Sequence, residues 1–572
     1  MLKHLLTKHG ENLSDLPLSE YPRPAFKRDS YFCLNGKWKF EINNSGEIPK
    51  DFTMEILVPY CPESLLSGIN KTFKKGDYFV YKRHFALPDG FKKDKVFLNF
   101  GAVNRAAKVY LNNTLVGEHL GSYLPFSFDV TEYLKEENEI TVICENDFDD
   151  FIYPYGKQCR KRGGMWYTPC SGIWQTVWLE SVSKDYISDV KISTDKNRVS
   201  FLISGTESGS IEIKTPDGIT KLDFQNGKGE IQLENPNFWS PENPYLYYCT
   251  VKSEQDEVKT YFALRTLEIK EIGGVMRTCL NGEPYFFNGL LDQGYFSDGI
   301  YTPASYENFE EDILTLKKLG FNMLRKHIKI EPQYFYYLCD KLGIAVFQDM
   351  VNNGKYSFFR DTALPTVGLK RFPDTILHTN KESRRVFKKY MAETVDLLKK
   401  HPSICCWTIF NEGWGQFCAN EMYLNLKAID STRFIDSASG WFKAKNNDFD
   451  SLHIYFKPVK TKKTDKPVFL SEFGGYSFKI TEHSFNDEQT YGYKKIENLE
   501  DFQRDFTALY KEQVMPAIKN GLCATVYTQV SDVEDETNGL LTYDRRILKL
   551  DEQRIKRLND KLFEEFNKAA RI

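Results

Sequence analysis

The sequence lacks the features that mark a membrane-spanning or a secreted protein. No window approaches about 18 uncharged apolar residues, so we expect no transmembrane helix. The start, "MLKHLLTKHGENLSD", has neither an apolar core nor a small-residue cleavage site, so we expect no signal peptide. Twelve cysteines lie scattered without a Cys-x-x-Cys pair, which favours reduced, mostly buried thiols and a cytoplasmic location.

An excess of charge of either sign is also missing. Lys plus Arg number 76 and Asp plus Glu 79, for a net charge of −3. This near balance argues against nucleic acid or an anionic membrane surface as the main partner. Neither zinc-ligand nor dinucleotide-loop spacing occurs, so we expect no metal and no cofactor. The acidic segment 532–539, "DVEDETNG", lacks the EF-hand spacing of calcium sites.

The chain is long and rich in apolar and aromatic residues. Its 572 residues are 41% hydrophobic and 15% aromatic, enough for several cores. Residues 1–184 consist of short strand-like runs with turn signals and no long helix, which predicts a jelly-roll β-sandwich. Residues 185–273 continue as strands and fit a second, immunoglobulin-like sandwich.

From residue 274 to 572 the pattern changes to strands that alternate with helices. Eight strand-like runs are expected at 284–291, 321–326, 345–350, 406–412, 433–440, 451–456, 467–474 and 524–530. Amphipathic helices are expected at 305–320, 332–343, 381–401, 499–521 and 551–569. Eight strand-helix units in about 300 residues predict a (β/α)8 TIM barrel.

Two of these strands end in a carboxylate. Glu412 closes the fourth predicted strand in "TIFNEGWGQF", and Glu472 closes the seventh in "PVFLSEFGG". Active sites of such barrels lie at the C-terminal ends of the strands, so we expect both side chains at one mouth. The glycines that follow each glutamate let the backbone turn sharply there. A carboxylate pair is what glycosidic bond cleavage needs, since one group protonates the leaving oxygen while the other attacks or activates water.

At this point the sequence resembles glycoside hydrolase family 2, which includes β-galactosidases, β-glucuronidases and β-mannosidases. The barrel motifs are "FNEGWG" (410–415), "FLSEFGG" (469–475) and "LNGEPYFFNG" (280–289). The segments 34–41, 100–131 and 171–180 resemble the sugar-binding sandwich of the family, and 262–270 resembles the end of its immunoglobulin-like domain. Their shared order extends the resemblance over nearly the whole chain.

The resemblance implies roles for single residues. It makes Glu412 the acid/base and Glu472 the nucleophile, while Asn411 matches an asparagine that contacts the sugar 2-hydroxyl. Three further matches are expected to bind substrate: Tyr455 close to the nucleophile, Asp292 after the first strand, and Arg325 in the second-strand motif. The family often shows Arg-x-x-His-x-Pro in that motif. Here His327 comes one position early, so either a sugar ligand or a structural hydrogen bond fits it.

Other candidates carry two interpretations each. Trp441 is expected to bind substrate, and both Trp441 and Trp414 could stack on a sugar. A Trp at a barrel rim contributes only to protein packing about as often. The basic segment 157–164, "KQCRKRGG", could reach the mouth and meet an acidic substrate, although charge runs are usually solvated.

The sequence therefore predicts a cytoplasmic, cofactor-free, retaining exo-β-glycosidase that acts on a carbohydrate, with homo-oligomerisation left open. A non-catalytic carbohydrate-binding protein is the rival of another class, because fold does not establish function. Family β-glucuronidases resemble one another in an Asn-x-Lys motif that holds the substrate carboxylate. At the matching place, before "GLLTYDRR" (539–546), this chain has Glu536, Thr537 and Asn538. Like charges repel, so we rank β-galactoside first and β-glucuronide second. A cation from the basic segment, Lys157, Arg160 or Arg162, would favour the second.

Overall fold

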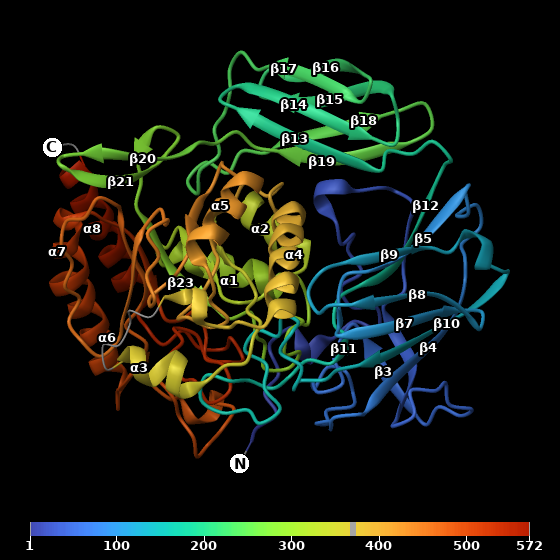
Figure 1. The fold of residues 1–572 in the computed structure, drawn as a ribbon, viewed down its shortest axis with the longest axis horizontal. Coiled ribbons are helices and arrows are strands. Elements are labelled where there is room, and N and C mark those ends of the chain that lie inside the picture. The colour runs from blue at the N-terminus through green and yellow to red at the C-terminus, as the bar shows by residue number, and fades with distance from the viewer. Residues whose placement is uncertain (1, 367–372, 571–572) are drawn as a thin grey trace.

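The structure is a computed structural model that describes residues 2–366 and 373–570. Three bodies follow one another along the chain (Figure 1): a blue-to-cyan sandwich, a green sandwich, and a barrel coloured from yellow-green to red. No helix among the described residues is long and apolar enough to cross a membrane.

The first body is the predicted β-sandwich. A six-stranded sheet, β3-β2-β4-β10-β7-β8, faces a four-stranded sheet, β1-β12-β5-β9, and neighbouring strands run antiparallel. The six-stranded sheet comprises β2 (Gly36–Asn43), β3 (Met54–Val58), β4 (Tyr78–Ala86), β7 (Ala106–Leu111), β8 (Thr114–Leu120) and β10 (Glu137–Glu145). The four-stranded sheet comprises β1 (Tyr31–Cys33), β5 (Lys95–Phe100), β9 (Phe126–Asp129) and β12 (Val177–Val182). The strands β6 (Val103–Asn104) and β11 (Gly172–Ile173) form a separate two-stranded sheet. Inward side chains of both sheets, such as Trp38 and Leu98, form one buried core.

The second body matches the predicted immunoglobulin-like sandwich. Its strands are β13 (Asp189–Asp195), β14 (Arg198–Ser204), β15 (Ser208–Thr215), β16 (Gly218–Gln225), β17 (Lys228–Gln232), β18 (Tyr247–Lys252) and β19 (Glu257–Phe262). Only one residue pair joins β16 to β17, so the sheet is nearly interrupted there. Side chains from both sides of this junction, such as Phe201 and Tyr247, share one core. A small sheet of β20 (Leu267–Ile272), β21 (Val275–Leu280) and β22 (Glu283–Pro284) then leads to the barrel.

The third body is the predicted barrel, and each of its eight strands overlaps one of the eight runs expected from the sequence. They are β23 (Phe287–Asp292), β24 (Met323–Lys326), β25 (Ala345–Asp349), β26 (Ile404–Thr408), β27 (Phe434–Asp436), β28 (Asp450–Ile454), β29 (Val468–Phe473) and β32 (Leu522–Tyr527). They pair in parallel in the order β27-β26-β25-β24-β23-β32-β29-β28. A backbone hydrogen bond from Asp448 N–H to the Ile435 carbonyl, 3.0 Å long, links the two ends of this sheet.

The helices of the barrel depart from the expected eight units. The described helices are α1 (Glu307–Lys318), α2 (Gln333–Leu342), α3 (Leu364–Thr366), α4 (Lys381–Leu398), α5 (Ala419–Ile429), α6 (Leu499–Ala508), α7 (Met515–Ala517) and α8 (Glu552–Ala570). The connections 437–449 and 455–467, after β27 and β28, contain none, so the expectation of eight strand-helix units is wrong there. A short pair, β30 (Tyr476–Ser477) and β31 (Lys494–Lys495), follows β29.

The barrel interior changes character along its strands. Its N-terminal half is filled by large apolar side chains, Phe287, Phe347, Phe434, Phe449 and Phe469. Towards the C-terminal ends the interior side chains become polar, and there the strands present Arg325, Asp349, Asp436 and Glu472. The apolar half supports the barrel, and the polar half can carry chemistry.

Candidate active site

Two strand ends bring the predicted carboxylate pair together. Glu472 lies within β29, and Glu412 lies four residues beyond the end of β26. An oxygen of each carboxylate and a ring nitrogen of His453 all lie within 4.8 Å of one another. Retaining glycosidases hold their two carboxyl groups about 5–5.5 Å apart, whereas inverting ones leave about 6.5–9.5 Å for a water molecule. The approach of the two carboxylates within 4.8 Å agrees better with the first of these ranges.

The turn after β26 explains how a carboxylate is presented there. Glu412 has a left-handed backbone with φ +51°, and Gly413 follows with φ +78°. A Cβ atom on Gly413 would lie 2.5 Å from the Phe442 ring. Glycine is therefore required by conformation and by space. A left-handed non-glycine residue is strained, and such strain is typical of functional sites.

Arg325 holds the nucleophile candidate in place from inside the barrel. Its Nε and one Nη donate to Asp349 at 2.9 and 3.0 Å, and further bonds reach the Ser471 carbonyl, Asn411 Oδ1 and Glu472 Oε1 at 3.0, 2.9 and 3.3 Å. These bonds use all five guanidinium hydrogens. Arg325 is fully buried. Arg325 thus holds Glu472 and has no donor left for a sugar, so its expected substrate binding stays a prediction that this geometry does not favour.

Charges around Glu472 keep its carboxylate ionised. Burial raises the pKa of this group, but the electrostatic effects of His453 and of Arg325 outweigh burial and hold the pKa below its usual range. The Tyr455 hydroxyl also donates to Glu472 and lowers that pKa further. An ionised carboxylate at neutral pH is what a nucleophile requires.

Tyr455 lies where the sequence places it, beside Glu472. Its hydroxyl contacts Thr528 Oγ1 at 3.1 Å as well as the carboxylate, and its ring stacks on Tyr493 with a centroid separation of 3.5 Å. The stacked partner fixes the ring plane, so the hydroxyl stays directed at the carboxylate.

His453 is the residue that the sequence did not point to. Its Nδ1 lies 2.8 Å from Glu412 Oε1 and 3.6 Å from Glu472 Oε2, and its Nε2 lies 3.0 Å from Ser439 Oγ. The imidazole thus connects the two carboxylates. Strand parity could have found it, because His453 lies two residues before Tyr455 and alternate residues of a strand face the same side.

Asn411 also reaches the site. Its Oδ1 accepts the bond from Arg325, which directs the amide nitrogen away from the guanidinium. That nitrogen makes no hydrogen bond to residues 2–366 or 373–570. Donation to a sugar hydroxyl, the role expected from the sequence, therefore stays a prediction that this geometry allows.

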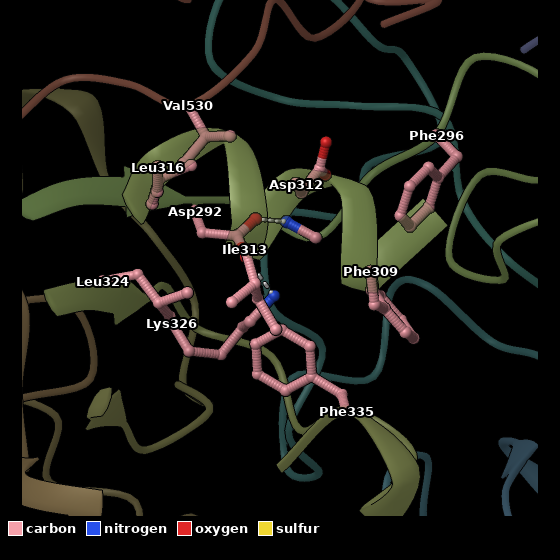
Figure 2. A pocket seen from close by; sticks show the side chains of 11 residues that line it. Asp292, Phe296, Phe309, Asp312, Ile313, Leu316, Leu324, Lys326, Phe335 and Val530 are labelled. Carbon is pink, nitrogen blue, oxygen red and sulfur yellow. Dashed lines mark hydrogen bonds and ion pairs between the residues drawn. The ribbon is translucent and has the colours of Figure 1, made fainter. Parts of the chain in front are cut away.

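Asp292, which was expected to bind substrate, does not join the carboxylate pair. In β23, Leu291 faces the barrel interior and Asp292 faces the opposite side. Its carboxylate pairs with Lys326 at 2.6 Å, and Figure 2 shows the two side chains pointing toward each other beneath α1. The cavity there leaves about 10 Å³, no more than one water molecule. The site in Figure 2 is a structural ion pair.

The remaining candidates divide between packing and the mouth. Trp414 is buried and stacks on Trp166 with centroids 5.4 Å apart, so packing accounts for it. Trp441 is half-buried, two residues beyond Ser439, and its contact with a sugar stays a prediction. The Nδ1 atom of His327 lies 2.7 Å from an Asp349 carboxylate oxygen. Of the two roles left open for His327, this contact fits the structural hydrogen bond. Burial, and then the charge of Lys157, lower its pKa to about 4, so its imidazole is neutral at pH 7.

The basic segment 157–164 meets the acidic segment 532–539. Arg162 lies 3.1 Å from Asp535 and 3.5 Å from Glu534. Asp532 pairs with Lys549 at 2.6 Å, and Glu536 accepts the Tyr167 hydroxyl. The acidic side chains are thus engaged by protein groups. The basic segment is not merely solvated, because it docks on the barrel mouth.

A double sandwich followed by a barrel with paired glutamates at its mouth defines a glycoside-hydrolase class of protein. The models "Glycosyl hydrolases family 2, sugar binding domain", "Glycosyl hydrolases family 2" and "Glycosyl hydrolases family 2, TIM barrel domain" match residues 69–181, 176–265 and 277–558. The chain belongs to glycoside hydrolase family 2, and the resemblance seen in the sequence is confirmed.

Relatives carry two activity names. A "Beta-galactosidase" of Thermoanaerobacter pseudethanolicus is 32% identical over 55% of this chain and 44% of its own length. A "Putative beta-glucuronidase" of Formosa agariphila is 24% identical over 80% of this chain and 58% of its own length. The chain thus spans about half the length of these curated relatives. A solved "Uncultured Clostridium sp. Beta-glucuronidase" superposes with a TM-score of 0.73 at 18% identity, covering 96% of this chain and 100% of that one, and shows the same fold.

Proposed function

We propose that this protein is a retaining exo-β-glycosidase, with Glu472 as nucleophile and Glu412 as acid/base. The observation that carries the proposal is the contact of the two carboxylates within 4.8 Å, one of them held ionised by Arg325, His453 and Tyr455. Loops of the first sandwich dock on the barrel mouth, which favours a terminal sugar over an internal one.

The two carboxylates would divide the work in two steps. Glu472 attacks the anomeric carbon while Glu412 gives its proton to the departing aglycone oxygen, and a glycosyl ester forms on Glu472. Glu412 then takes a proton from water, whose oxygen attacks the same carbon and releases Glu472. His453, hydrogen-bonded to Glu412, would hold that group in place in both steps. Neither step needs a cofactor.

The sugar is the finer part of the proposal. A β-galactoside is the first candidate on the sequence, and a β-glucuronide is the second, because relatives carry both names. We also propose a reducing, cytoplasmic compartment. All twelve cysteines are unpaired and nine are buried, which supports it.

Replacement of each carboxylate tests the catalytic assignment. Glu472→Gln should lower turnover of a nitrophenyl β-glycoside by about 10³-fold or more, because the covalent route is lost. Glu412→Gln should impair substrates with poor leaving groups far more than nitrophenyl glycosides, since a good leaving group needs little protonation. Wild-type turnover in both variants would refute the assignment. No hydrolysis of any chromogenic β-glycoside by the wild type would favour the rival, a non-catalytic carbohydrate-binding protein.

The stereochemistry of the first product tests the retaining route separately. Two displacements at the anomeric carbon should release the β-anomer first, and mutarotation should produce the α-anomer later. Proton NMR in the first minutes of hydrolysis distinguishes the two. Initial release of the α-anomer would mean a single displacement by water and would exclude the glycosyl ester.

A further inference from the structure

Lys157 is a buried cation without an anionic partner. It is 7% exposed, and its ammonium makes no hydrogen bond or ion pair to the described residues, 2–366 and 373–570. The other buried lysines differ, since Lys326, Lys329 and Lys549 each pair with a carboxylate at 2.6–2.9 Å. A buried charge is costly unless it is paired, so a lone buried ammonium indicates a missing anion.

Aromatic rings hold this ammonium in place. Its Nζ lies 5.7 Å from the centre of the Tyr167 ring and 5.8 Å from that of Trp414. Such cation–π contacts compensate only part of the lost hydration. They leave the three N–H donors of the ammonium available to a ligand.

Hydrogen bonds hold the loop that carries Lys157. The Tyr167 amide donates to the Lys157 carbonyl at 3.0 Å. The adjacent Gln158 accepts from the Cys170 amide at 2.8 Å and donates to the Tyr123 hydroxyl at 3.0 Å. The ammonium is therefore presented from a fixed backbone, and little conformational entropy is lost when it binds an anion.

Lys157 lies at the mouth that holds the carboxylate pair. Trp414, one wall of its aromatic box, lies two residues after Glu412. The charge of Lys157 contributes to the low pKa of His327, which shares Asp349 with Arg325. The cation thus faces the same polar end of the barrel as the two reacting glutamates.

Other charged side chains at this end already have protein partners. Arg162 pairs with Asp535, and Arg160 lies 3.3 Å from Asp149. Glu536, which in the sequence seemed set to repel an acidic sugar, accepts hydrogen bonds from Tyr167 and Asn538 instead. Of the two lysines of the basic segment, neither of which has an ion pair to the described residues, Lys161 is exposed, and Lys157 is thus the buried cation whose charge remains available.

We propose that the Lys157 ammonium, boxed by Tyr167 and Trp414, receives the carboxylate of an acidic sugar, so that the enzyme prefers β-hexuronides to neutral β-hexosides. This rests on the proposed glycosidase function and reverses the order of sugars expected from the sequence. An ammonium is a point charge on a flexible stem and imposes little geometry. The site therefore selects the charge at C6 more strongly than the configuration at C4.

Four nitrophenyl β-glycosides test this: galactoside and galacturonide, and glucoside and glucuronide. Each pair differs only at C6. In the wild-type enzyme kcat/KM should be at least tenfold higher for each uronide than for its neutral partner. Lys157→Gln should lower kcat/KM for both uronides by about 10²-fold or more and change the neutral sugars by less than threefold. Arg160→Gln, whose side chain is 37% exposed, is the matched control and should leave both ratios unchanged.

Inhibition of the wild-type enzyme tests the proposal without relying on the folding of a variant. Free glucuronate and galacturonate should inhibit more strongly than glucose and galactose by at least tenfold, and high salt should weaken that difference. Wild-type preference for the neutral sugars, or Lys157→Gln with unchanged uronide ratios, would overturn the proposal while leaving a glycosidase. No turnover of any of the four substrates, and no covalent labelling of Glu472 by a 2-deoxy-2-fluoro glycoside, would refute the glycosidase itself.

Discussion

At the scale of single residues, Glu472 is defined by what surrounds it. Arg325 and Asp349 form a buried, bidentate ion pair, and the guanidinium donates one further hydrogen bond to Glu472. Two carboxylates therefore share one guanidinium, and the His453 ring lies 3.6 Å from Glu472 and helps to lower its pKa. The arrangement stabilises the ionised form of Glu472, the proposed nucleophile.

Arg325→Lys tests this arrangement. The ammonium cannot reproduce five directed bonds, so kcat/KM should fall by about 10²-fold. The sign of the pH effect follows from the pKa of Glu472. That pKa is now depressed, so the nucleophile stays ionised as pH falls below its usual range. A lysine keeps the charge but cannot direct donors at both Glu472 and Asp349 as the guanidinium does, so the pKa of Glu472 should rise and the acid limb of the kcat/KM profile should move to higher pH.

A second buried arginine provides the control for that experiment. Arg277 donates to the Ile518 and Leu522 carbonyls at 3.0 and 3.3 Å and has no part in the site. Arg277→Lys should reduce stability and leave the acid limb where it is. An unmoved acid limb in Arg325→Lys would mean that the guanidinium does not tune Glu472.

At the scale of elements, strand positions were predictable and strand faces were not. All eight barrel strands overlap the expected runs, because such strands are buried on both faces and are nearly continuous in apolar residues. The same continuity removes the alternation that distinguishes inside from outside. Asp292 was therefore assigned to the mouth although it faces the helices, and His453 was overlooked although it faces the mouth.

The connections between strands were less predictable still. The segments 437–449 and 455–467 carry no helix, yet they supply Trp441 and Tyr455 at the mouth. Their conformation depends on packing against the barrel rim, as in the contact of Gly440 with the His453 ring, and not on local helix propensity. The fold class can be predicted from the number of strands, whereas the conformation of the barrel rim depends on tertiary contacts.

The turn after β26 offers a test of one such element. Gly413→Ala should place a methyl group against Phe442 and strain the left-handed backbone by about 1–3 kcal/mol, moving Glu412 and lowering kcat/KM at least tenfold. Gly282→Ala is the control, because Gly282 has φ +89° but nothing within 4 Å of its added Cβ. The positive φ should destabilise both variants, and only Gly413→Ala should lose activity. Equal activity in the two would show that this turn does not position Glu412.

At the scale of the whole molecule, the first sandwich completes the barrel mouth. The Tyr155 amide donates to the Asn352 carbonyl at 3.1 Å, and the Thr168 amide donates to Glu534 at 2.8 Å. These contacts join segments separated by about 200 and 366 positions in the chain. The sequence indicated the basic segment as a candidate for substrate binding. It did not predict which basic side chains would pair with a carboxylate and which would remain unpaired.

The junction between sandwich and barrel should respond to pH through Glu534. Burial raises the pKa of this carboxyl to about 7, since the Thr168 amide and Arg162 offset burial only in part. The unfolded chain releases the proton near pH 4.5, whereas the folded protein keeps it until about pH 7. The contribution of Glu534 to stability is therefore complete below about pH 4.5 and is lost as pH rises through 7.

Glu534→Gln should remove this loss, because the amide stays neutral at every pH. The thermal midpoint of the wild type should fall from pH 5 to pH 8 by more than that of Glu534→Gln, since each pKa unit corresponds to about 1.4 kcal/mol. Calorimetry at both pH values measures the difference. Glu497→Gln, at an exposed position, is the control and should follow the wild type. If Glu534→Gln also follows the wild type, the buried carboxyl does not govern the junction, and the docking of the sandwich loop must rest on Arg162 and Asp535 instead.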